Sequence, residues 1–137
     1  MSDSHQPLSS KQTLLLILVP MLGTFVSMRL YLHLVGVQHV YPGGYLVHHL
    51  FTGVLITIPA AFVLAFEIRQ RSLAFAARIA LGVGSAMILD EIVFLVMTKA
   101  SDEDYVSLLS LWGGLGFVTF ATILLYILYR SLRNRSK

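Results

Sequence analysis

Long apolar segments alternate with short polar ones through most of the chain. The apolar segments cover about residues 13–35, 45–67, 73–98 and 106–129. Each is close to the roughly 20 residues that a helix needs to cross a hydrocarbon core of ~30 Å. The pattern therefore predicts an all-α integral membrane protein with four transmembrane helices.

The connections between these segments are short and cover residues 36–44, 68–72 and 99–105. Short connections between long helices favour antiparallel neighbours, which predicts an up-down-up-down bundle. A pair of helical hairpins, or a dimer of such pairs, would produce the same sequence pattern. We expect one membrane domain over residues 1–137, ending in a basic tail at 130–137.

The composition agrees with a membrane protein and narrows the chemistry. The 137 residues are 56% hydrophobic and 12% charged, with a mean hydropathy of +0.77, values typical of membrane rather than soluble proteins. There is no cysteine, which excludes disulfides, cysteine-ligated cofactors and cysteine nucleophiles. The net charge of +3 comes from basic residues beside apolar segments, so no nucleic-acid partner is expected. The first apolar segment is too long for the core of a signal peptide and is expected to be a retained helix.

The distribution of basic residues predicts the orientation in the cell membrane. The connection at 99–105 has Lys99 as its only basic residue, together with three acidic ones. The opposite side has eight: Lys11, Arg69, Arg71, Arg78, Arg130, Arg133, Arg135 and Lys137. Lysine and arginine collect on the cytoplasmic side, so both termini are predicted to be cytoplasmic. The basic tail is expected to contact anionic lipid headgroups.

Two adjacent carboxylates interrupt the third apolar segment. Asp90 and Glu91 lie within GVGSAMILDEIVFLVM (82–97). A single central aspartate costs about 2.5–3.5 kcal/mol on insertion scales, so this pair requires neutralising partners. The predicted topology places the candidates in the extracytoplasmic half of the bilayer, at the level of the acids or just above it: Arg29, His33, His39, His48 and His49.

Imidazoles with carboxylates, in the absence of thiolates, are ligands for zinc, iron or manganese. The favoured hypothesis is a divalent metal site built from His48, His49, Asp90 and Glu91, with His33 as a further ligand. Three residues are predicted to support the site: Arg29, which would orient a carboxylate or meet an anionic substrate, His39 and Trp112. If the protein is an enzyme, metal-activated water acting on a lipid or small molecule is the most economical mechanism. The pattern does not identify catalytic residues.

Other interpretations of the same cluster stay open. The polar residues would also form a structural ion-pair network, as in an accessory subunit of a larger membrane complex or a homo-oligomer. A proton or cation relay would use the carboxylate pair for transport, although the cytoplasmic half offers little polar path. Haem between His33 and His48 or His49 would leave the acids unexplained.

Two short motifs resemble a pattern in small bacterial multi-span membrane proteins of unassigned function. These are HHLFTG (48–53) and GVGSAMILDEIVFL (82–95). The pattern is an HHxxxG helix followed by a glycine-rich helix that ends in Asp-Glu, and the resemblance covers about fifty residues. It implies no activity, cofactor or substrate.

Overall fold

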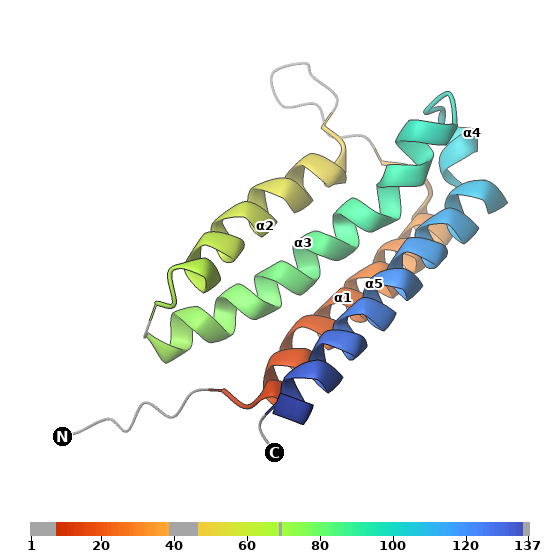
Figure 1. Ribbon diagram of the computed structural model, residues 1–137. Coiled ribbons are helices and arrows are strands. Elements are labelled where there is room, and N and C mark those ends of the chain that lie inside the picture. The colour runs from red at the N-terminus through yellow and green to blue at the C-terminus, as the bar shows by residue number, and fades with distance from the viewer. Residues whose placement is uncertain (1–7, 39–46, 69, 136–137) are drawn as a thin grey trace.

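The computed structural model describes residues 8–38, 47–68 and 70–135. These residues form helices joined by short connections and contain no strand, which confirms the all-α prediction. The helices are α1 (Ser10–Val35), α2 (His49–Ala65), α3 (Arg71–Met97), α4 (Asp102–Tyr105) and α5 (Leu108–Arg135) (Figure 1). Within the described ranges, α1, α3 and α5 are long and apolar enough to cross a membrane, whereas α2, with 17 residues, is shorter.

The helix ends differ from the predicted bounds in ways that local chemistry explains. α1 begins at Ser10 because Ser9 and Gln12 form a capping box, each side chain bonding the backbone N–H of the other. It ends at Val35, and the following residue, Gly36, caps it with a φ of 86° that suits glycine. At the other end of the chain α5 continues to Arg135, so much of the expected basic tail is helical.

The connection after α3 contains a short helix that the apolar pattern did not predict. α4 begins after Ser101, and Ser101 and Asp104 form a second capping box. The hydrogen bond from Ser101 lowers the pKa of Asp104 below its usual value. This single turn fixes Tyr105 at its C-terminal end, directly before α5.

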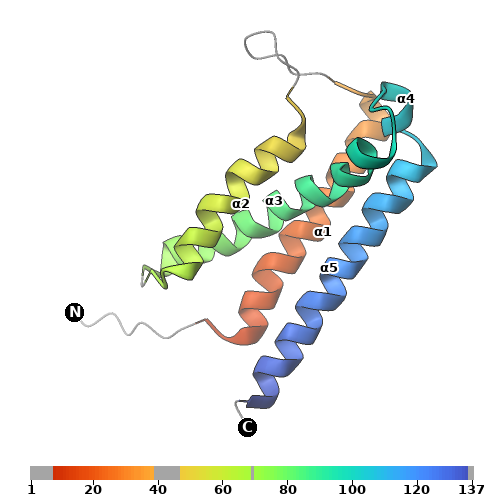
Figure 2. The same cartoon turned by 45° about the horizontal axis from the view of Figure 1, so that its top comes forward.

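α3 is the common partner of the other long helices. It packs against α1, α2 and α5, while α1 also contacts α5. Figures 1 and 2 show α2 and α5 on different sides of α3. Successive long helices alternate in direction, and α1 begins at the same end of the bundle at which α5 finishes. The opposite end, where α3 finishes and α5 begins, is called the α4 end below.

Glycines set the close approach of each helix to α3. A Cβ on Gly82 would overlap the backbone oxygen of Ile17 on α1. A Cβ on Gly53 of α2 would lie 2.7 Å from the carbonyl oxygen of Gly84. Gly113 on α5 has the same role, since a Cβ there would overlap a side chain of α3. Small residues at such contacts permit the tight packing on which membrane helices depend.

This packing predicts that replacing Gly82 with alanine destabilises the fold. The atoms that the new methyl group meets are backbone atoms of α1, which cannot move aside as a side chain can, so we expect a cost of about 1–3 kcal/mol. The measurement is thermal unfolding in detergent. Gly116→Ala is the matched control, because nothing lies within 4 Å of its Cβ position, and it should be neutral or stabilising. Equal effects of the two substitutions would contradict the packing.

Candidate functional site

The two buried acids face different neighbours. Asp90 and Glu91 lie near the α4 end of α3 and are 0% and 2% exposed. Consecutive residues of a helix do not share a face. Asp90 therefore meets α1 and the segment from α4 to α5, whereas Glu91 meets the beginning of α2.

Arg29 is the fixed counter-ion of Asp90. Its Nε donates to Asp90 Oδ1, and the two side chains are 11% and 1% exposed. Its Nη2 donates to the carbonyl oxygens of Asp90 and Ser110, at 3.0 and 3.1 Å. The guanidinium thus joins α1, α3 and α5 at one point. A buried pair of this kind is costly to break, because the partner left behind keeps an uncompensated charge.

Glu91 is bound by the beginning of α2. His48 Nδ1 lies 2.6 Å from Glu91 Oε1, and the backbone N–H of Leu50 donates to Oε2 at 2.7 Å. The first N–H groups of a helix have no partner within the helix. Glu91 therefore caps α2 from α3, which explains why this helix begins at His49 although His48 provides no side-chain cap.

His49 lies between the two acids. Its Nε2 is 3.2 Å from Asp90 Oδ2, and its Nδ1 is 3.3 Å from Glu91 Oε2. The Tyr105 hydroxyl lies 3.2 Å from His49 Nε2 and donates to Asp90 Oδ2 at 3.0 Å. Burial, followed by the charges of Asp90 and Glu91, raises the pKa of Tyr105 far above its usual value. The hydroxyl therefore remains a hydrogen-bond donor at neutral pH.

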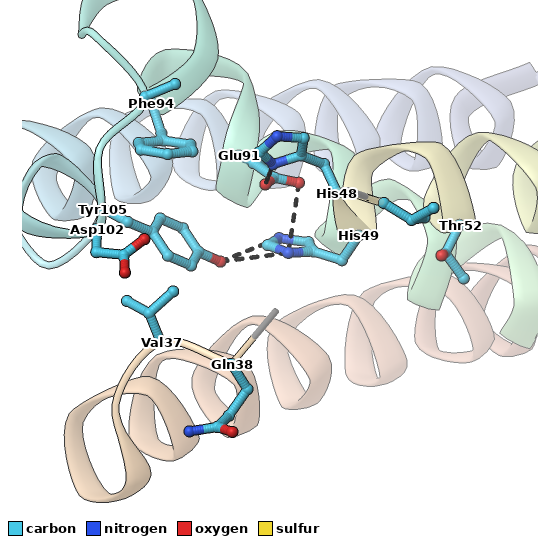
Figure 3. Close-up of a pocket in the computed structure, with 11 residues that line it drawn as sticks. Val37, Gln38, His48, His49, Thr52, Glu91, Phe94, Asp102 and Tyr105 are labelled. Atoms are coloured by element: carbon cyan, nitrogen blue, oxygen red, sulfur yellow. Dashed lines mark hydrogen bonds and ion pairs between the residues drawn. The ribbon is translucent and has the colours of Figure 1, made fainter. Parts of the chain in front are cut away.

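A cavity of about 220 Å³ opens beside this cluster at the α4 end. Figure 3 shows His48 against Glu91, and His49 against the Tyr105 hydroxyl, with Phe94 above Tyr105. The lining residues are Val37, Gln38, Val47, His48, His49, Thr52, Glu91, Phe94, Ala100, Asp102 and Tyr105. Both imidazoles are partly exposed, with 22% of each side chain accessible. Both histidines and Glu91 thus border the cavity, whereas Asp90 is not among its lining residues.

Only one of the two buried acids contacts a permanently charged basic side chain. Asp90 has Arg29, which is always protonated. Glu91 has no arginine or lysine in the contacts described for it, and its charged-partner contacts are with His48 and His49. In the described contacts, Glu91 is therefore paired with imidazoles and not with a permanently charged side chain.

The structure brings together most of the predicted site residues. His48, His49, Asp90 and Glu91 meet as predicted, and Arg29 supports them. His33 is exposed and lines a different cavity.

Three further outcomes concern the predicted metal site. Trp112 is 64% exposed and is not part of the cavity lining described above. His39 lies outside the described residues. Among the described residues, no three His, Asp or Glu side chains are already arranged around a common metal position.

Sequence reasoning missed Tyr105, Ser110 and the Leu50 N–H. Tyr105 is the last residue of the polar connection at 99–105, a position that gives no signal of a buried contact. Ser110 is fully buried, and both its hydroxyl and its carbonyl accept from Arg29. No sequence motif announces a backbone N–H or carbonyl as a partner, so these contacts required the three-dimensional structure.

Comparison of the chain with protein-family models, curated proteins and solved structures gives no match. The resemblance to small bacterial membrane proteins stays a prediction. Any function must therefore be argued from the geometry of the cluster and its cavity.

The Arg29–Asp90 pair predicts a strong and non-additive effect of substitution. Asp90→Asn leaves the guanidinium buried without its counter-ion, and we expect a loss of about 3–5 kcal/mol of unfolding free energy. Arg29→Met with Asp90→Asn should cost less than the sum of the two single changes, because the double variant leaves no charge unpaired. Unfolding in mixed detergent micelles measures both effects. The control is Glu103→Gln on exposed α4, which should stay within about 0.5 kcal/mol of the wild type. Strict additivity would show that the pair is not coupled.

Proposed function

We propose that this is a membrane protein that binds a divalent cation, with zinc, iron or manganese as the candidates. In this proposal the protein crosses the cell membrane four times and has both termini in the cytoplasm. The His/carboxylate cluster then lies in the extracytoplasmic half of the bilayer. The observation that supports the cation site most is the charge count. Of the two buried carboxylates, Asp90 contacts an arginine, whereas Glu91 contacts two histidines beside an open cavity.

The histidines are the proposed metal ligands. Histidines that bind metals usually use their second ring nitrogen to contact a carboxylate or a carbonyl oxygen. His48 has this arrangement, because Glu91 holds Nδ1 and leaves Nε2 for a metal ion. His49 is the proposed second ligand, with a small rotation away from Tyr105 and the acids. Asp90 and Glu91 then compensate the charge and orient the rings, in place of the four-ligand set expected from the sequence.

Two imidazoles leave coordination positions for water or for a substrate. An open position is the feature that separates catalytic zinc sites from closed structural ones. A cation here would be reached through the cavity, whose rim includes the acidic Asp102. If the protein is an enzyme, the chemistry that fits is activation of a bound water molecule against a small molecule or a lipid headgroup.

A structural role is the second candidate, and one observation favours it. Each carboxylate oxygen of Asp90 and Glu91 has a polar neighbour from the protein: Arg29 and Tyr105 for Asp90, His48 and Leu50 for Glu91. A network satisfied in this way fixes the register of the helices without a ligand. An accessory subunit of a larger membrane complex would need nothing more.

Zinc titration of purified protein distinguishes the two roles. Isothermal titration of a preparation without a histidine tag should show one site per chain. The variant His48→Ala/His49→Ala should lose the site, and Glu91→Gln should weaken it about 10–100-fold, as for other carboxylates that orient metal-binding histidines.

His33→Ala is the matched control for this titration. It removes an exposed imidazole from the same end of the molecule but from outside the cavity, so zinc binding should be unchanged. Circular dichroism verifies that each variant is helical. Absence of stoichiometric zinc, iron or manganese binding in the wild type would contradict the metal site and favour the structural role.

A further inference from the structure

A second cavity lies at the same end of the molecule, between α1 and the α4–α5 segment. It has a volume of about 260 Å³ and is lined by Arg29, Leu32, His33, Val106 and Leu111. None of these residues except Arg29 takes part in the His/carboxylate cluster described above. The cavity combines two nitrogen-containing side chains with three apolar ones, and the cation site does not explain it.

Arg29 lines this cavity and retains hydrogen-bonding capacity. Its Nε and Nη2 are bound to Asp90 and Ser110. Its Nη1 has two hydrogens but makes one long contact, 3.4 Å to the carbonyl oxygen of Tyr105. His33 follows four residues later on α1 and therefore lies on the same helix face. The two side chains present N–H donors about one turn apart.

The remaining walls are apolar and open outward. Leu32 is buried, but Val106 and Leu111 are 57% and 37% exposed. The cavity lies beside α1 and α5, both long and apolar enough to cross a membrane. In a membrane, an opening between two such helices would face the lipid. A donor pair next to apolar walls matches a ligand with an anionic head and a hydrocarbon body.

We propose that this cavity binds an anionic phospholipid of the leaflet at the α4 end. The phosphate accepts hydrogen bonds from Arg29 Nη1 and His33, and the glycerol and first acyl carbons contact Leu32, Val106 and Leu111. Arginine is well suited to phosphate because its planar group offers several donors. The apolar walls select a lipid over a soluble phosphate. This site is separate from the headgroup contacts expected for the basic residues near the C-terminus.

The only tryptophan of the chain provides a local probe. Trp112 follows Leu111 and is 64% exposed. It lies roughly 27 Å along α5 from Arg130, at 1.5 Å per residue, so it does not sense lipids at the basic end. Its fluorescence is measured in bilayers that contain phosphatidylglycerol or phosphatidylcholine with acyl chains brominated close to the headgroup. Brominated phosphatidylglycerol should quench the Trp112 fluorescence with an apparent affinity about fivefold higher than that of brominated phosphatidylcholine. This is the preference expected for one basic side chain at an anionic headgroup.

Three variants test whether this preference belongs to the cavity. His33→Ala removes one of the two donors and should lower the ratio of affinities. Leu111→Phe fills the space and should bring the ratio close to one. Leu124→Phe adds the same bulk at an exposed position farther along α5 and should leave the ratio unchanged. Equal quenching by both lipids in the wild type, or an unchanged ratio in His33→Ala and Leu111→Phe, would overturn the proposal. Abolition of the preference by soluble glycerol phosphate would also overturn it, in favour of a site for free phosphate.

Discussion

The structure depends on the burial of two neighbouring carboxylates in an apolar helix. Because Asp90 and Glu91 point in different directions from α3, their partners must come from different elements. α1 provides Arg29, the beginning of α2 provides His48 and the Leu50 N–H, and the segment before α5 provides Tyr105. Helices that pack closely on α3 through glycine contacts are thereby also joined at the α4 end by charged hydrogen bonds.

The two acids differ in how permanently they are compensated. Asp90 faces a guanidinium that keeps its charge, whereas Glu91 faces imidazoles whose charge depends on a proton. In a low-dielectric setting an unbalanced charge is expensive, so the Glu91 half of the cluster favours a cation. The cavity beside His48 and His49 is the place that our proposal assigns to such a cation. Arg29 joins three helices in the other half of the cluster and also lines a separate cavity beside α1 and α5. The two proposals therefore place ligands of opposite charge on different sides of one ion pair.

The hydrophobic pattern was sufficient to predict the all-α class and the common level of the polar residues along the helix bundle. Apolar length predicted the bounds of α1 and α3 to within three residues, whereas α5 continues six residues beyond its predicted end at 129. Because successive helices run in opposite directions, the sequence also predicted that Arg29, His48 and His49 lie at the level of Asp90 and Glu91. The depth of a residue in the bundle does not determine which way its side chain points from the helix axis. His33 shares the level of the cluster but faces the α1–α5 side, and Trp112 faces outward. Tyr105 enters the site because the capped turn of α4 redirects the chain, an effect of Ser101 and Asp104 that hydropathy does not register.

X-ray absorption at the zinc edge tests the central claim most directly, because it identifies the atoms around the metal. In zinc-loaded wild-type protein the account predicts imidazole nitrogens at about 2.0–2.1 Å, with oxygen atoms completing the shell. The imidazole scattering should disappear in His48→Ala/His49→Ala and persist in His33→Ala. A shell of oxygen atoms alone in the wild type, or imidazole scattering that survives removal of both His48 and His49, would contradict the account.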